Sequence, residues 1–299
     1  VSYHQGRINV NARGHVIASC AYRFEGISGA HYALNKDALA AQGGKEYQPT
    51  LYPGRISSST TPCIHVWDKH GKLIYEDAVP GVGQVDGVGI DREDNIYFMH
   101  TAARDLDGKA YFDRTSETMT KVKPQVGKIV VKGSAPVPMN DAEAPKRNPD
   151  FYSGGASPSW MDNAEWFYGG VGFAGFNPGH APACACWFSR FALDYFARSI
   201  APEPTLYSVA VLDSAGNLIT RIGRFGNVDD GQPLVAHPEM KSPNSLGGDE
   251  VGLFYACYVG THTDRRIFIS DVGNGRIVSV KLGYYTTELA KIPGDKGKP

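Results

Sequence analysis

Apolar and polar residues alternate in short runs along much of this chain, and turn residues separate the runs. Residues 63–74 read C-I-H-V-W-D-K-H-G-K-L-I, and residues 207–219 read Y-S-V-A-V-L-D-S-A-G-N-L-I. In both, the alternation runs into Asp-x-x-Gly-x-Leu-Ile, which is typical of two strands joined by a tight turn. A second phrase recurs at residues 8–17 and 88–97. The pattern therefore predicts a series of β-hairpins.

The hairpins group into four blade-like units, so the sequence predicts an all-β protein, a β-propeller with four-stranded antiparallel blades. The first unit is expected at residues 7–20 and 63–79, and the second at 86–100 and 126–132. The third is expected at 159–170 and 207–223, and the fourth at 250–262, 266–271, 276–282 and 286–292.

The fourth unit carries a family resemblance. Residues 266–280 read R-I-F-I-S-D-V-G-N-G-R-I-V-S-V and resemble the core of the NHL repeat, and residues 91–97 are similar to it as well. The resemblance implies an NHL-like propeller, nominally of six blades, of which about four are recognisable here. It implies that two blades lie in atypical sequence, or that a longer parent chain or another subunit supplies them.

Three long segments interrupt the units, at residues 21–62, 101–125 and 171–205. Each is expected to join a second strand to a third, so all three should cap one face around the mouth of the central channel. Loops held by a rigid scaffold often carry functional residues. We therefore expect one propeller domain over residues 1–299, standing alone or as part of a longer chain or complex.

The last of these segments contains residues 189–199, S-R-F-A-L-D-Y-F-A-R-S, which predict a short helix with Ser189 as its N-cap. Asp194 lies four residues from both Arg190 and Arg198, a spacing that predicts ion pairs on a helix. The helix either seals the capped face or presents a binding surface. In the second case Arg190 is a candidate catalytic residue that steadies a developing anion. The candidate ligand-binding residues beside it are Trp187, Tyr195 and Arg198.

The same segment contains Cys184-Ala-Cys186, with His180 four residues before the first cysteine. These side chains could bind zinc or copper. The alternatives are a disulfide to Cys257 or small buried thiols.

Acidic residues lie at the start of the inner strands in two units. Asp86 lies at this position in the second unit, and Asp249 and Glu250 lie there in the fourth. They could bind calcium or another ligand through their oxygens, or cap turns. The expected cofactor is therefore a divalent metal: zinc, copper or calcium.

Histidines and cysteines also stand at strand ends. His100 and His262 are candidate catalytic residues, as a general base or as zinc ligands, against the commoner role of hydrogen-bonded structural histidines. Cys20 and Cys63 flank the first long segment, and if their strands pair, the two residues fall within disulfide distance.

Composition narrows the function classes. Apolar residues make up 42% of the chain and charged residues 20%, with a net charge of −1, which favours a soluble globular protein over a nucleic-acid or anionic-membrane binder. No apolar run is long enough to span a bilayer. The sequence also lacks a P-loop, a dinucleotide fingerprint and a C-x-x-C-H motif, so neither a nucleotide nor a covalent c-type haem is expected.

Three functions remain. The leading hypothesis is a binding module for a small-molecule or protein ligand on the capped face, in an extracellular or periplasmic setting. The alternatives are a metal-dependent lyase or hydrolase at the channel mouth, and an architectural subunit whose partners supply the missing blades. Fold alone does not choose between them.

Overall fold

A computed structural model describes residues 8–23, 60–82, 85–112, 115–132, 138–139, 145–152, 159–173, 189–227 and 251–283. Its elements are β-strands and two short 3-10 helices, η2 (Pro204–Leu206) and η3 (Val272–Asn274). The all-β prediction is confirmed. No helix within these ranges has the length and apolar character needed to cross a bilayer.

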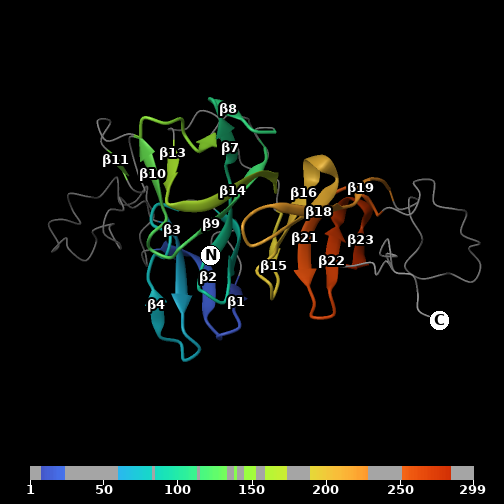
Figure 1. Ribbon diagram of the computed structural model, residues 1–299, viewed down its shortest axis with the longest axis horizontal. Coiled ribbons are helices and arrows are strands. Elements are labelled where there is room, and N and C mark those ends of the chain that lie inside the picture. Colours follow the sequence, from blue (N-terminus) through green and yellow to red (C-terminus); the bar gives the residue numbers. More distant parts are fainter. Residues whose placement is uncertain are drawn as a thin grey trace, which may run out of the picture.

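Three four-stranded antiparallel sheets and one three-stranded sheet form the blades (Figure 1). The first blade holds β1 (Ile8–Val10), β2 (Val16–Arg23), β3 (Thr60–Trp67) and β4 (Leu73–Tyr75). The second holds β5 (Val85–Ile90), β6 (Ile96–His100), β9 (Glu117–Val122) and β14 (Ala164–Val171). The third holds β15 (Ala192–Leu193), β16 (Ser199–Glu203), β17 (Ser208–Leu212) and β18 (Leu218–Ile222). The fourth holds β21 (Ala256–Thr261), β22 (Arg266–Asp271) and β23 (Arg276–Lys281).

Two further groups of strands accompany the blades. A six-stranded sheet runs in the order β11 (Pro138–Met139), β10 (Lys128–Lys132), β13 (Ser159–Asp162), β12 (Phe151–Tyr152), β7 (Ala103–Leu106) and β8 (Lys109–Ala110). A parallel pair joins β19 (Arg224–Phe225) to β20 (Gly252–Leu253).

The first strands of neighbouring blades touch one another: β1 contacts β5, β5 contacts β15, and β15 contacts β21. Each blade therefore packs on the next through its first strand, as in a propeller, and the four blades form an arc.

The second blade is buried on both faces, and successive side chains of its strand β6 pack on opposite faces. Ile96 and Phe98 pack toward the first blade, whereas Tyr97 and Met99 pack toward the third. Successive residues of a strand point to opposite faces of the sheet, so one strand can serve two interfaces. Burial on both faces explains why β5 is buried throughout its length.

The helix predicted at residues 189–199 is wrong, because this segment forms β15, a turn and the start of β16. The Asp194 carboxylate accepts hydrogen bonds from the backbone N–H groups of Phe196 and Arg198, both at 2.9 Å. Such side-chain bonds to nearby amides offer the backbone an alternative to the helix. Ala197 has a φ of 58°, which a right-handed helix does not contain.

The assignment of two other segments also needs correction. Residues 101–125 contain β7, β8 and β9, and residues 171–205 contain β15 and β16, so both supply strands where long loops were expected. Consequently the third strand of the second blade is β9 and not the strand expected at 126–132. Residues 159–170 are not the inner pair of the third blade, since β14 pairs with β9 in the second.

Among the described residues, six hairpins share one turn, at residues 11–15, 68–72, 91–95, 194–198, 213–217 and 262–266. In each, the N–H of the first residue bonds the carbonyl of the fifth, and the N–H of the fourth bonds the carbonyl of the first. The fourth residue always has a positive φ. In five of the six, the first residue is Asp or Asn, and its side chain accepts from the third and fifth amides. The repeated sequence phrase is therefore the signature of this turn.

These turns join first to second strands and third to fourth strands of a blade. In an antiparallel sheet both kinds of connection lie at the same end, which we call the turn end. The turns between β3 and β4 and between β21 and β22 point downward in Figure 1.

Candidate ligand-binding site

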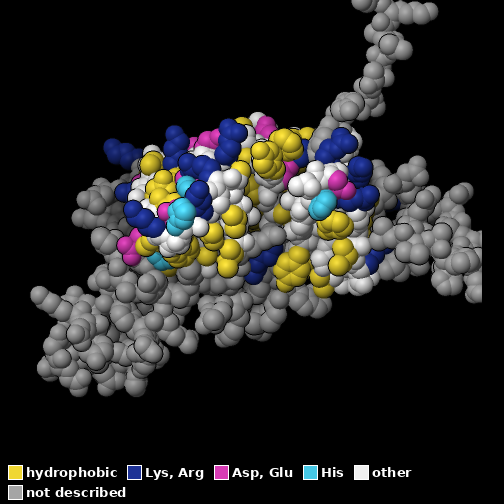
Figure 2. All heavy atoms as spheres, turned by 90° about the horizontal axis from the view of Figure 1, so that it is seen from below, with side chains coloured by type: hydrophobic (Ala, Val, Ile, Leu, Met, Phe, Trp, Pro, Cys, Tyr) yellow, Lys and Arg dark blue, Asp and Glu magenta, His cyan; other side chains and the backbone are white. Residues whose placement is uncertain are grey.

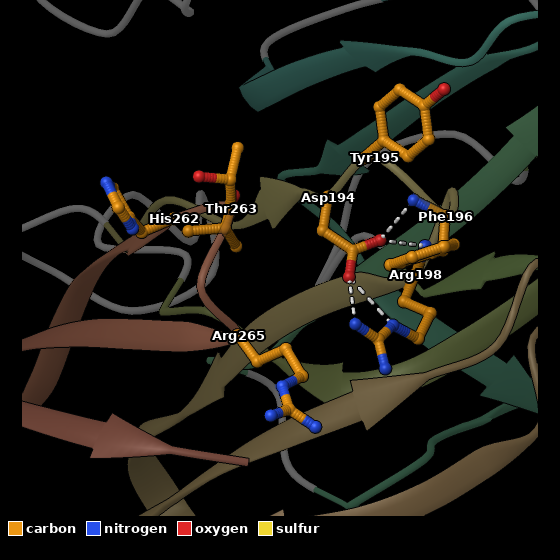
Figure 3. A pocket seen from close by; sticks show the side chains of 8 residues that line it. Asp194, Tyr195, Phe196, Arg198, His262, Thr263 and Arg265 are labelled. Carbon is orange, nitrogen blue, oxygen red and sulfur yellow. Dashed lines mark hydrogen bonds and ion pairs between the residues drawn. The ribbon is translucent and has the colours of Figure 1, made fainter. Parts of the chain in front are cut away.

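A cavity of about 350 Å³ lies at the turn end between the third and fourth blades (Figure 3). The turn between β15 and β16 forms one side, and the turn between β21 and β22 forms the other. The lining residues are Asp194, Tyr195, Phe196, Arg198, Thr261, His262, Thr263 and Arg265. Three residues singled out in the sequence, Tyr195, Arg198 and His262, thus meet in one place.

Two aromatic side chains at the tip of the first turn form the apolar part of the site. Tyr195 is 77% exposed and Phe196 is 65% exposed, and their rings meet edge to face with centroids 5.5 Å apart. The same two positions in the turns at 68–72 and 91–95 hold charged or imidazole side chains. The turn at 194–198 therefore departs from these two turns by exposing two aromatic rings beside the cavity.

Charged groups surround the aromatic pair. Arg198 donates to the Asp194 carboxylate through Nε at 2.7 Å and also through Nη2, and its guanidinium lies 5.2 Å from the centre of the Phe196 ring. On the opposite turn, His262 Nδ1 lies 2.7 Å from Asp264 Oδ1, and this contact lowers the pKa of the Asp264 carboxyl. The lining therefore combines ring faces with fixed charges, as ligand sites commonly do.

A second cluster of ionisable residues is buried where the second, third and fourth blades meet. Arg190 Nη1 lies 3.0 Å from Asp86 Oδ1, and the Asp86 side chain is fully buried. Glu117 at the start of β9 is also fully buried, and burial together with the neighbouring Asp86 carboxyl raises its pKa well above 4.5. Two carboxyl groups thus lie near one guanidinium, and burial and the neighbouring Asp86 carboxyl favour the protonated form of Glu117.

Close packing of the blades creates this cluster. A Cβ atom at Gly87 would lie 2.9 Å from Phe191 Cδ1, and one at Gly89 would lie 3.1 Å from Leu193 Cβ. The two glycines of β5 therefore let β15 and the residues just before it approach closely, which sets Arg190 beside Asp86. The Arg190 N–H also donates to the Cys257 carbonyl at 2.8 Å, which ties the third blade to the fourth.

Burial keeps both Cys257 and His100 uncharged at neutral pH. Burial raises the pKa of the Cys257 thiol to about 11, so it is not a thiolate at neutral pH. Burial lowers the pKa of His100 to about 4, and its ring packs on Phe151 with centroids 4.6 Å apart. His100 ends β6, away from the turn end that carries His262. The structure does not bring the two candidate histidines together.

The strand pairing behind the expected disulfide is present, since Cys20 and Cys63 are direct partners in the register of β2 and β3. The bridge itself is not supported, because Cys63 is a buried thiol whose Sγ lies 3.2 Å from His65 Nε2. Cys257 is likewise a thiol. The Cys20 side chain lies outside the described residues.

Several predicted site residues also lie outside the described ranges: His180, Cys184, Cys186, Trp187, Asp249 and Glu250. The metal site built on the first three stays a prediction. In the parts of the chain that the structure describes, no group of three or more His, Cys, Asp and Glu side chains is arranged to hold a metal ion.

Sequence reasoning missed several residues of both clusters. Asp194 was assigned to a helix, and Phe196, Thr261, Thr263 and Arg265 were not singled out as ligand-binding residues. A search for the turn that allowed residues other than glycine at the fourth position would have found the turn at 194–198, whereas the turn at 262–266 also departs at its first position, His262. Glu117 gave no such signal, because only the pairing of β9 with β6 brings it near Asp86.

Comparisons with known proteins do not assign a family. No family model and no curated protein matches the sequence. A protein of unknown function from Bacteroides caccae covers 93% of this chain over 77% of its own, with 10% identity and a TM-score of 0.30. Virginiamycin B lyase from Staphylococcus aureus covers 95% of this chain over 72% of its own, with 11% identity and a TM-score of 0.28. A gluconolactonase from Xanthomonas campestris covers 70% over 62%, with 11% identity and a TM-score of 0.23. Likeness at this level says nothing about activity, and the NHL resemblance remains one of residue pattern.

Proposed function

We propose that this chain is a binding module that holds a small molecule in the cavity between the third and fourth blades. The observation that supports this is the pair of exposed rings, Tyr195 and Phe196, at the edge of a cavity that also contains arginine, histidine and threonine side chains. A volume of about 350 Å³ falls at the lower end of the range for ligand pockets.

The site lies at the turn end of the blades. The cap expected from the sequence belongs to the connections between second and third strands, at the opposite end. The proposal therefore keeps the binding role inferred from the sequence and assigns it to a different face. Figure 2 views the molecule from below, where hydrophobic side chains intermingle with basic and histidine side chains.

The test is a search for small-molecule binding by NMR, with the backbone amides of the turns at 194–198 and 262–266 as reporters. We expect aromatic fragments to shift these amides and to lose this effect in the double variant Tyr195→Ala, Phe196→Ala. The matched control is Lys69→Ala, His70→Ala, which truncates the same two tip positions in a turn of the first blade. Fragment binding that ignores the first pair of substitutions would rule the site out.

A further inference from the structure

We infer that the cavity selects a small aromatic anion, such as an aromatic carboxylate, with its ring on the Tyr195–Phe196 pair and its charge toward the arginines. This inference rests on the proposed function and specifies the ligand of the same site.

The apolar half of the ligand follows from the ring geometry. Tyr195 and Phe196 stand edge to face, and the Phe196 ring already carries the Arg198 guanidinium within 5.2 Å of its centre. A flat aromatic ligand can pack on this pair by stacking or by edge contacts. Each such contact adds binding free energy beyond that of burying apolar surface. An aliphatic ligand would gain only the burial.

The charge of the ligand follows from the balance of the lining residues. Arg198 and Arg265 contribute two positive charges, and Asp194 contributes one negative charge. The net charge of these three side chains is therefore positive.

The single lining carboxylate is committed to its own turn. Asp194 binds Arg198 and accepts from two backbone amides, so it serves to shape the site. Behind the lining, Asp264 Oδ2 accepts from Arg266 Nε at 3.0 Å, and these two charges offset each other. Thr261 and Thr263 add hydroxyl groups that can donate to an anion.

The position of the groups fits one molecule that carries both features. Figure 3 shows Asp194 and Arg198 on one side of the cavity and His262, Thr263 and Arg265 on the other. A ligand anchored on the aromatic tip of the first turn can present its carboxylate to the second turn.

The experiment compares 1-naphthoate with 1-naphthamide, which has nearly the same shape and no charge. Both are titrated into the protein and followed by NMR at the amides of the two turns. We expect naphthoate to bind about tenfold more tightly, because a charge-assisted contact is stronger than a neutral one. Added salt should weaken naphthoate binding and leave the amide nearly unchanged.

Two substitutions separate the ring from the charge. Arg265→Gln should remove most of the difference between the probes, whereas Tyr195→Ala should weaken both probes alike. Arg92→Gln serves as control, because Arg92 is an exposed arginine in the equivalent turn of the second blade. Thermal melting of each variant verifies that it is folded.

Each outcome decides a different question. Equal affinity for naphthoate and naphthamide overturns the inferred charge preference and leaves the proposed binding function standing. Failure of both probes to bind at millimolar concentration overturns the inference and the proposed function together. Binding that shifts other amides and survives Arg265→Gln also overturns the inference.

Discussion

Two of the arginine–aspartate pairs that the structure describes have different roles. Arg190 and Asp86 join separate blades, whereas Arg198 and Asp194 lie four residues apart in one turn. The two arginine side chains are almost equally exposed, at 15% and 16%. What differs is the span of each pair and the buried Glu117 beside the first. The exposure of the arginine therefore does not separate the two roles. An ion pair between residues of different blades stabilises the fold, whereas a pair within one turn shapes the local surface.

The largest expected effect comes from breaking the pair between blades. Arg190→Gln leaves the Asp86 carboxylate buried without its cation, which should cost about 3–5 kcal/mol of unfolding free energy. Arg198→Gln should cost about 1 kcal/mol or less, because its partner retains two backbone donors and lies near solvent. Urea unfolding of both variants measures the difference. Equal losses would show that the two pairs are equivalent and would end the comparison.

The second prediction concerns Glu117 and the pH dependence of stability. Its pKa is raised by burial, so the folded protein keeps the proton at pH values where the unfolded chain has lost it. Stability is therefore fully present below about pH 4.5 and declines as the pH rises toward the folded-state pKa, at about 1.4 kcal/mol per pH unit.

Glu117→Gln removes this titration, since the amide resembles the protonated acid in shape and does not ionise. We expect the variant and the wild type to have equal stability near pH 4, with the variant increasingly more stable as the pH rises above about 4.5. Melting temperatures across this range measure the gap. Parallel curves would show that Glu117 is not held protonated.

The third prediction uses the repeated turn to change the charge of the cavity. The Asn11 side chain accepts hydrogen bonds from the third and fifth backbone amides of its turn, as the Asp194 side chain does in the cavity turn. Asp194→Asn should therefore retain the turn while it removes the negative charge from the lining. We expect naphthoate to bind about threefold more tightly, with unfolding free energy within about 1 kcal/mol of the wild type. Weaker naphthoate binding by a folded variant would contradict the assigned charge balance.

The last prediction concerns backbone strain in the cavity turn. Ala197 has a φ of 58°, a conformation that costs a residue with a side chain about 1 kcal/mol relative to glycine. Ala197→Gly should raise stability by up to about 1 kcal/mol. Gly71→Ala, at the same position of a first-blade turn with no atom near the added methyl, should lower it by a similar amount. Changes of the same sign in the two variants would show that the turns differ in shape.

The two hairpins of the first blade and the outer hairpin of the third blade, at residues 213–217, were predictable because turn chemistry is local. An Asp or Asn followed three residues later by Gly specifies the side-chain acceptor and the positive φ together. The turn at 194–198 keeps the Asp and replaces the Gly with Ala197, and the remaining pattern then matched a helix. The Asp194–Arg198 contact was correctly predicted although its helix was not, because the turn also brings these two positions together.

The cluster of Asp86, Arg190 and Glu117 could not be derived from the sequence as a unit. Asp86 and Arg190 were both singled out, yet nothing local joins residues of different blades. Their contact depends on how closely β5 approaches the third blade, which the glycines at 87 and 89 allow. The order of the strands had to be known first, and the sequence assigned the wrong strands to the inner pair of the third blade.

The shared turn also has a consequence for altering this protein. Its shape depends on the first, fourth and fifth positions and on main-chain bonds. In the turn at 194–198 the Tyr195 and Phe196 side chains make none of these bonds, whereas in the turn at 262–266 the third residue, Asp264, accepts from Arg266. Where the second and third side chains make no such bonds, they can be exchanged while the turn keeps its shape. A designer could transplant the Tyr-Phe dipeptide of one tip to another blade, or swap it for a different chemistry, without rebuilding the sheets beneath.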